Sequence, residues 1–506
     1  MAARPLIRGT RHTGGFIVRG TTLAAAACVV AACTATGAVS GAAQGKITTA
    51  PANTASPANT ASPANTASPE GTGGTTGANW PEYDGNAART GIAAGVPVDG
   101  ALTAAWTARL DGAVYGQPLV VGNEVIAATE NDSIYALSRS TGKVIWRTNV
   151  GTPVPQQDLH GCGDIFPLGI TGTPIYDADN GLVYAVAEIT GYHHMLVALD
   201  VATGAVELQR YLDVPRTTNQ PAYDQQRPGL AIDDGRVYAT FGGLAGDCGP
   251  YQGNIVSAPL TGNGPLIGWH TPTSREGAIW APGGPVVGPN GDLWVAIGNG
   301  AAESGDPYDG SDSVTELTPA TESSPVLARV TYFAPSTWAA DNASDLDLGS
   351  TQPVLAADNT VFIMGKRGVG YLLSETRLGG IGGQLAEQNI CDARGTAAVS
   401  GSIVYEPCVD GGVAAIEVSA ANKTIKVLWR GPSNSNGSPV VGGGAVWVTA
   451  YSDASPTALY ELNQSTGAVE HKISISRVLP HFSSLSLSGS TAYVSTLTGI
   501  TAINIG

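Results

Sequence analysis

The sequence predicts an all-β fold, an eight-bladed β-propeller, and three observations support this prediction. Glycine (67) and proline (32) are abundant while charged residues make up only 13% of the chain, a balance that favours short strands and tight turns over long surface helices. A strand-and-turn unit recurs at a spacing of roughly 40 to 60 residues, the period of propeller blades. The two ends of the repeating region carry partial units that complete each other.

The repeating unit is clearest in its last part, where a strand runs into a turn and a further strand follows. It reads IYALSRSTGKVIW, LVALDVATGAVEL, VAAIEVSAANKTIKVLW and LYELNQSTGAVEH. Weaker copies are IVSAPLTGNGPLIGW, VTELTPATESSPVLA and VGYLLSETRLGGIGG. A β-sandwich is the alternative all-β fold, but it would not reproduce the same turn at the same point of each unit.

The two ends of the repeating region each hold part of a blade. The last segment, STAYVSTLTGITAINIG, supplies three strands, and LTAAWTARL at 102–110 is a single strand before the first full unit. Joining them completes an eighth blade and removes the open edges of an unclosed ring. We therefore expect residues 80–506 to form one ring, with blades that begin near Val114, Ile170, Gly229, Gly283, Gly349, Gly395, Gly437 and Ser483.

Residues 1–32 have the pattern of an export signal. Their basic start is followed by the apolar run TTLAAAACVVAA, which is too short to span a bilayer as a mature helix. The ending Val30-Ala31-Ala32-Cys33 resembles a bacterial lipobox, which implies lipidation of Cys33 and a membrane anchor on the extracytoplasmic side. The alternative is an ordinary signal that is cut after small residues, with Cys33 incidental.

Residues 33–79 form a tether in this interpretation. The segment contains PANTAS three times and has almost no large apolar side chains to bury, while its repeated prolines block helix formation. We expect it to be disordered and partly extended.

Four further cysteines follow the tether, and in an exported protein they predict two disulfides with three possible connectivities. We expect Cys162 to pair with Cys248 and Cys391 to pair with Cys408, because each pair falls in neighbouring or identical repeats. No two cysteines are adjacent in the sequence.

The charge of the chain excludes one class of partner. The net charge is −16, and a surface this acidic repels phosphate backbones, so we expect no nucleic-acid binding. The sequence also contains no G-x-S-x-G elbow, P-loop or H-E-x-x-H pattern, which leaves hydrolase and nucleotide-binding classes without support.

The turn from Ala136 to Trp146 resembles the repeat of pyrroloquinoline quinone (PQQ) type propellers, and the resemblance covers about 400 residues. This group contains quinoprotein alcohol dehydrogenases and also non-enzymatic lipoproteins that assist outer-membrane protein assembly. Both branches share the turn, so the resemblance implies the fold and leaves the function open.

Four segments resemble cofactor-binding segments of the dehydrogenases. EGAIW resembles the segment whose tryptophan lies beneath the quinone, here Trp280, and MGKRGVGYLL resembles the one whose lysine meets the quinone oxygens, here Lys366. VYAVAEITG and LWVAIGNG resemble the strands that bear calcium ligands, here Glu188 and Asn299. An aromatic face, a cation and oxygen ligands suit a flat anionic quinone with a divalent ion.

Each of these residues also has a structural interpretation. Trp280 is the kind of residue found in a blade core, Glu188 suits a solvated strand end, and Lys366 suits a turn. Asn299 stands between two glycines, where a turn with positive φ is expected. If a quinone and a metal ion are bound, all four side chains should converge on one point of the ring axis.

Two departures from the dehydrogenases count against catalysis. Where they place an acid that acts as the base, the segment DSVTELTP has Thr318, which is no useful base near neutral pH. Another acid, such as Asp312, would have to take that role. The ring of adjacent bonded cysteines that covers the quinone in many such enzymes is also missing.

These observations lead to one expected function and one alternative. We expect a monomeric, lipid-anchored, extracytoplasmic binding or scaffold protein, whose long connections form one rim that holds a protein or cell-envelope ligand. The alternative is a PQQ- and calcium-dependent alcohol or sugar dehydrogenase. Alternating acids from Asp341 to Asp347 resemble part of a calcium loop but foremost a family structural feature, so an ion there is left open.

Overall fold

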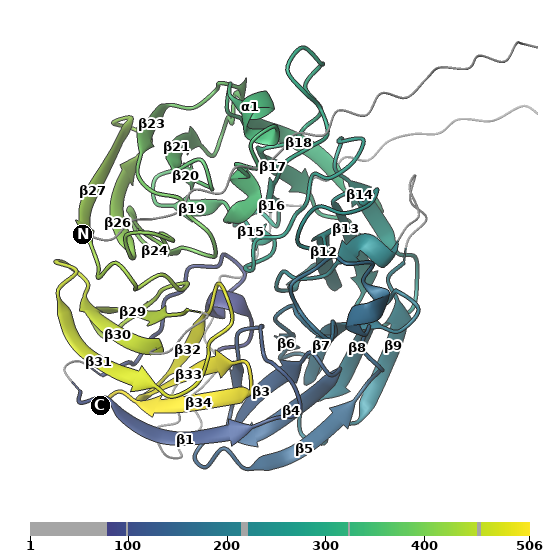
Figure 1. Ribbon diagram of the computed structural model, residues 1–506, viewed down its shortest axis with the longest axis vertical. Helices are drawn as coiled ribbons and strands as arrows, with labels where there is room; N and C mark the ends of the chain where they lie inside the picture. Colours follow the sequence, from purple (N-terminus) through teal and green to yellow (C-terminus); the bar gives the residue numbers. More distant parts are fainter. Residues whose placement is uncertain (1–77, 98–99, 214–220, 322–323, 453–456) are drawn as a thin grey trace, which may run out of the picture. The chain divides into compact units, whose positions relative to one another are not determined.

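The computed structural model describes residues 78–97, 100–213, 221–321, 324–452 and 457–506. The predicted export signal, most of the predicted tether and Cys33 lie outside these residues. The described chain forms eight separate β-sheets that follow one another around a ring, as Figure 1 shows. The predicted eight-bladed all-β propeller is confirmed.

The first four blades are ordinary antiparallel sheets with small additions in blades three and four. Blade one contains β2 (Leu119–Val121), β3 (Glu124–Thr129), β4 (Ser133–Ser138) and β5 (Val144–Asn149). Blade two contains β6 (Ile175–Asp177), β7 (Leu182–Ile189), β8 (His193–Asp200) and β9 (Val206–Tyr211). Blade three contains β11 (Ala231–Asp233), β12 (Arg236–Gly243), β13 (Asn254–Pro259) and β14 (Ile267–His270), with β10 (Asp224–Gln225) also paired to β12. Blade four contains β15 (Val286–Val287), β16 (Leu293–Ile297), β17 (Ser313–Thr318) and β18 (Ala328–Ala334), and β22 (Gly380–Ile381) pairs with β18 in parallel.

The last four blades complete the ring. Blade five contains β19 (Val354–Ala356), β20 (Thr360–Ile363), β21 (Val369–Ser374) and β23 (Ala386–Asn389). Blade six contains β24 (Ala398–Ser400), β25 (Ile403–Glu406), β26 (Ala414–Ser419) and β27 (Thr424–Arg430). Blade seven contains β28 (Val440–Gly442), β29 (Ala445–Ala450), β30 (Thr457–Asn463) and β31 (Val469–Ile475). Blade eight contains β32 (Leu485–Ser488), β33 (Thr491–Thr496), β34 (Gly499–Asn504) and, as its outer strand, β1 (Thr103–Arg109).

The ring closes where the predicted strand at 102–110 meets the last strand of the chain. β1 pairs antiparallel with β34, in a register that runs from Thr103 opposite Asn504 to Arg109 opposite Gly499. The eighth blade is therefore made from both ends of the repeating region, as expected. Each predicted blade start lies two to five residues before the first strand of its blade.

The recurring TG turn holds neighbouring blades together. Trp146, at the outer edge of blade one, donates its indole N–H to the carbonyl of Val201 at 2.8 Å, in the turn of blade two. Gly204 of that turn has φ +70°, and a Cβ there would lie 2.5 Å from the Trp146 ring. Trp106 with Gly142 and Trp429 with Gly467 repeat this arrangement. The glycine supplies both a left-handed turn and room for the tryptophan of the preceding blade.

The antiparallel order of each blade gives the ring two different faces. Turns between first and second strands and between third and fourth strands lie on one side, which we call the turn face. Loops between second and third strands and the connections between blades lie on the other side, which we call the loop face. The long connections, among them 150–174, 298–312 and 335–353, all belong to the loop face, so they form one rim as predicted.

The helical segments are short, and they lie in connections. They are α1 (Trp338–Asn342) and the 3-10 turns η1 (Tyr83–Gly85), η2 (Gln156–Asp158), η3 (Pro221–Tyr223) and η4 (Leu348–Ser350). Within the described residues, no helix has the length and apolar character needed to cross a membrane.

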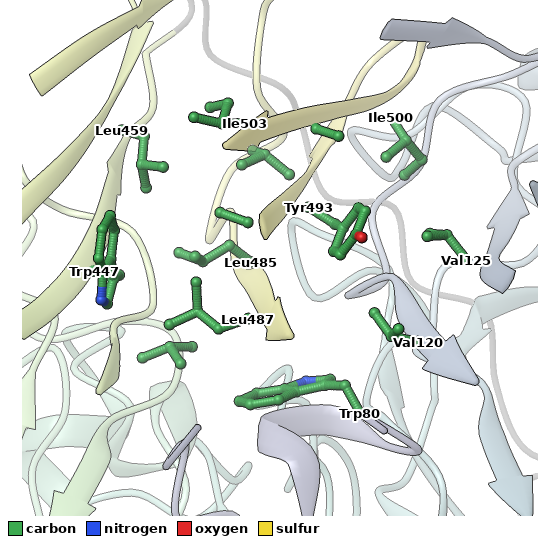
Figure 2. Packing of buried hydrophobic residues seen from close by; sticks show 14 of the residues in the cluster. Trp80, Val120, Val125, Trp447, Leu459, Leu485, Leu487, Tyr493, Ile500 and Ile503 are labelled. Atoms are coloured by element: carbon green, nitrogen blue, oxygen red, sulfur yellow. The ribbon is translucent and has the colours of Figure 1, made fainter. Parts of the chain in front are cut away.

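Residues 78–97 fill the ring axis from the turn-face side, and we call them the plug. Trp80 pairs with Val120 of blade one, and the amide of Ala93 donates to the carbonyl of Val441 in blade seven at 2.7 Å. Trp80 is only 2% exposed, and Figure 2 shows it packed near Val120 and Leu487. The plug therefore belongs to the core and closes the axis on this side.

Both predicted disulfides are present, and both lie on the loop face. Cys162–Cys248 joins the connection between blades one and two to the β12–β13 loop of blade three. Cys391–Cys408 joins the outer end of blade five to blade six. Disulfides are typical of extracytoplasmic proteins.

Candidate functional site

A cavity of about 700 Å³ opens at the loop face, on the ring axis. Its walls come from segments spread around the ring, from blade one to blade eight, which places the cavity at the centre. The lining contains both aromatic and charged side chains, among them Tyr115, Trp280, Tyr451 and Phe482 with Arg227 and Lys366.

The blade repeat places many of these residues at the axis. Tyr115, Arg227, Arg394 and His481 each stand four residues before the first strand of their blade. First strands start at the loop face next to the axis, so the residue at this position faces the centre of the ring. The sequence analysis missed these four residues, although an alignment of the repeats at this position could have found them.

Trp280 and Lys366 lie together in the cavity wall. The Nζ of Lys366 is 5.6 Å from the centre of the Trp280 ring. The same ammonium forms ion pairs with Asp345 at 2.7 Å and Asp347 at 2.5 Å. Burial opposes the charge of Lys366, but the two carboxylates more than offset this effect and raise its pKa above the ordinary value.

Asn299 lies next to this group and is held by the same two acids. Its backbone N–H donates to Asp347 Oδ1 at 2.7 Å, and its Nδ2 donates to Asp345 Oδ1 at 3.0 Å. The side-chain Oδ1 of Asn299 is buried and has no hydrogen-bond partner among the residues that the structure describes. The structure thus brings Trp280, Asn299 and Lys366 together around Asp345 and Asp347.

Glu188 belongs to a different group of contacts. It is 3% exposed, its Oε1 accepts the backbone N–H of Gln226 at 2.5 Å, and its Oε2 lies 3.7 Å from His194 Nε2. It does not belong to the cavity lining. The expected convergence of all four side chains is therefore seen for three of them.

The structure corrects the placement of Thr318. β16 and β17 are antiparallel, with Ile297 opposite Ser313 and Leu293 opposite Leu317, so Thr318 lies at the end of β17 that is remote from Asn299. Thr318 is exposed on the turn face and says nothing about a catalytic acid at the axis. A one-dimensional match of strand and turn could not tell which end of the strand faces the site.

Asp312, the other acid considered, lies on the correct side but behind the cavity wall. It is fully buried, and its Oδ1 accepts the backbone N–H of Leu348 at 2.9 Å. Burial first, and then the charge of Asp347, raises its pKa well above the ordinary value. A buried carboxyl outside the cavity lining is poorly placed to take a proton from a substrate.

The alternating acids from Asp341 to Asp347 are held by cations of the chain itself. Asp341 pairs with Arg367 and accepts a hydrogen bond from Thr337 at 2.8 Å, while Asp345 and Asp347 share Lys366. Within the described part of the chain, no group of three or more His, Cys, Asp or Glu side chains is placed to hold a metal ion. The acids fit a structural role that fixes the connection before blade five.

These contacts test whether the site suits a quinone and calcium. Calcium prefers several oxygen ligands, but Lys366 already neutralises the acids beside Asn299, and Glu188 is bonded elsewhere. The donor set therefore does not fit a calcium ion. The aromatic ring of Trp280 with cations beside it does suit a flat organic anion.

Comparisons with known proteins point to two functional branches. A family model described as outer membrane protein assembly factor BamB matches residues 96–311. The BamB protein of Yersinia pestis is 30% identical over 156 residues, which cover 31% of this chain and 33% of that protein. A probable quinate dehydrogenase (quinone) of Xanthomonas campestris pv. juglandis is 27% identical over 243 residues, which cover 46% of this chain and 27% of that protein. The chain thus matches a third or less of either relative's length.

The solved structures give the same architecture. The quinohemoprotein alcohol dehydrogenase ADHIIG from Pseudomonas putida HK5 superposes with a TM-score of 0.61 at 14% identity, covering 85% of this chain and 80% of that chain. A likeness at this identity concerns the fold alone. The blade pattern, the family model and this structural neighbour together show that the chain is a PQQ-like eight-bladed β-propeller.

Proposed function

We propose that the protein is an extracytoplasmic binding protein that holds its ligand in the axial cavity of the loop face. The observation that carries the proposal is the cavity itself, whose volume of about 700 Å³ falls within the range of ligand pockets, roughly 300 to 1,000 Å³. Its aromatic and charged lining offers both apolar contact and oriented polar groups.

The cavity walls are held in place without a ligand. Cys162–Cys248 ties two loops at the rim, and Gly246 and Asp247 beside it line the cavity. Lys366 ties the connection before blade five to the β20–β21 turn. A pocket that is already ordered loses little conformational entropy on binding, which favours affinity.

The rim and the N-terminal segment complete the proposal. The Yersinia pestis relative is an assembly factor, which supports a protein or cell-envelope ligand on the rim. We also propose that the protein is a monomer. Lipidation of Cys33 would anchor it to the membrane. Fractionation of Cys33→Ser tests the anchor, since an unchanged membrane fraction would contradict it.

Native mass spectrometry with a cavity variant tests the binding proposal. The protein is incubated with the small-molecule fraction of an envelope extract from its own host. We expect a bound mass that Trp280→Ala loses and that Trp269→Ala keeps, because Trp269 is a partly exposed tryptophan on β14 outside the cavity. Equal adducts on both variants would place the ligand elsewhere.

A PQQ-dependent dehydrogenase is the second candidate, because Trp280, Asn299 and Lys366 lie together at the axis. Its test is to add PQQ with calcium and to measure the bound quinone spectrum and dye-linked alcohol oxidation. We expect no turnover, since Asp345 and Asp347, the acids of the described lining nearest to this group, are both paired with Lys366. Binding with turnover would replace the first proposal by the second.

A further inference from the structure

The guanidinium of Arg227 lies in the cavity lining against aromatic rings and not against acids. Its guanidinium carbon lies 4.8 Å from the centre of the Phe482 ring and 5.7 Å from that of Trp280. These cation–π contacts orient the side chain but use none of its five N–H donors. No hydrogen bond or ion pair reaches the Arg227 guanidinium from any residue that the structure describes.

The other cations of the lining are already neutralised. Lys366 pairs with Asp345 and Asp347, and Arg394 pairs with Asp392 at 2.8 Å. Arg227 is therefore the one cation of the described lining that lacks an acid within 4.0 Å.

The other acids of the described lining, Asp247 and Asp164, form no ion pair with Arg227. Asp247 accepts the hydroxyl of Tyr251 at 2.5 Å, and Asp164 lies 3.7 Å from His481 Nε2. The charge of Asp164 acts on Arg227, but no ion pair joins these two described residues. The donors of Arg227 remain available to a molecule that enters the cavity.

A second observation beside Arg227 points to the same kind of ligand. Arg227 also lines a small hollow of about 20 Å³, together with Tyr83 of the plug and Thr171 of blade two. Both residues are 2% exposed; the Tyr83 hydroxyl lies beside the hydroxyls of Thr396, Ser438 and Ser484, and the Thr171 hydroxyl lies beside the carboxyl of Glu130. Hydroxyl donors next to a guanidinium form a group that suits anionic oxygen atoms.

We propose that the axial cavity binds a small organic anion and that Arg227 holds its carboxylate or phosphate group. The planar guanidinium fork matches both groups in a bidentate manner. This inference rests on the proposed binding function and adds to it the chemical class of the ligand and the residue that anchors it. Phe482 and Trp280 would contact the organic part.

Isothermal titration calorimetry in phosphate-free buffer tests the proposal with matched probes. The probes are 2-naphthoate, 2-naphthyl phosphate and the neutral 2-naphthamide. We expect at least one of the two anions to bind about tenfold or more tightly than 2-naphthamide, because charge-assisted hydrogen bonds are roughly twice as strong as neutral ones. The comparison of naphthoate with naphthyl phosphate tells which anion the site prefers.

Three variants connect the preference to Arg227. Arg227→Gln should remove the difference between anion and amide, and Arg227→Lys should retain part of it because the charge stays while the fork is lost. Arg329→Gln is the matched control, since Arg329 also lies over an aromatic ring, 4.8 Å from the centre of Tyr332, but outside the cavity. Thermal unfolding of each variant confirms that the ring is intact.

The outcomes separate this inference from the proposed function. Equal binding of anion and amide by the unchanged protein would overturn the anion site and leave cavity binding in place. Anion binding that survives Arg227→Gln would overturn the role of Arg227. Failure of all three probes to bind would count against both proposals.

Discussion

Arg89 in the plug and Arg227 in the cavity show how differently the two sides of the ring axis are built. Arg89 is fully buried, and its guanidinium donates to Glu82 at 2.6 Å, to the carbonyl of Tyr83 at 3.0 Å and to that of Leu230 at 2.6 Å. Arg227 has aromatic rings around its guanidinium and no such acceptors among the described residues. On the turn-face side, the plug closes the axis and the donors of Arg89 are bonded within the protein. On the loop-face side, the proposed ligand would take the donors of Arg227.

The same contrast appears in the connections. On the turn face, three short TG turns receive a tryptophan from the neighbouring blade, which gives these turns a structural partner. The loop face carries long connections that are tied to one another by disulfides and ion pairs around the cavity. Stability is concentrated on the turn face and ligand contact on the loop face.

The largest expected effect is that of Arg89→Ala, which should lower the free energy of unfolding by about 3–5 kcal/mol because it leaves Glu82 without its buried partner. Arg227→Ala should cost about 1 kcal/mol or less, since it removes only cation–π contacts. Urea unfolding of both variants measures the difference. Equal losses would show that Arg227 is a structural residue and would remove the contrast between the two sides.

A smaller effect is expected for the TG turn on the turn face. Gly204→Ala should cost about 2–3 kcal/mol, because the new Cβ would lie 2.5 Å from Trp146 and φ is +70°. Gly181→Ala is the control, with φ +69° and no atom within 4 Å of a new Cβ, and should cost only about 1 kcal/mol from backbone strain. Similar midpoints of thermal unfolding for the two variants would argue against tryptophan docking.

The smallest effect concerns a buried acid at the loop face. Burial raises the pKa of Glu406 to about 8 from its usual 4.5, and its Oε1 has no hydrogen-bond partner in the described part of the chain. The folded state holds this proton more tightly than the unfolded state, so Glu406 lowers stability as the pH rises from about 4.5 to about 8.

Glu406→Gln should therefore stabilise the protein by on the order of 1–2 kcal/mol at pH 8 and change little at pH 4. Unfolding in urea at both pH values measures this. Glu417→Gln is the control, because Glu417 is half exposed and lies 3.9 Å from Lys426. A gain for Glu406→Gln that is the same at both pH values would rule out titration as its cause.

The sequence by itself determined the architecture. The TG turns and their tryptophans recur in several blades because each blade forms its own local hairpins, so Trp146 and Gly204 could be found as a pattern. The strand at 102–110 and the pairs Cys162–Cys248 and Cys391–Cys408 could be predicted because the repeat order brings them together. A periodic fold makes long-range neighbours readable from spacing.

The site was decided by the tertiary structure. Lys366 between Asp345 and Asp347, Glu188 with Gln226 and the face on which Thr318 lies all depend on which strand end reaches the axis. The contact of Arg227 with Phe482 joins residues 255 positions apart, on irregular connections into blades three and eight. Such connections have no common length or period, so only the closed ring brings their side chains to one cavity, where the donors of Arg227 meet no acceptor among the described residues.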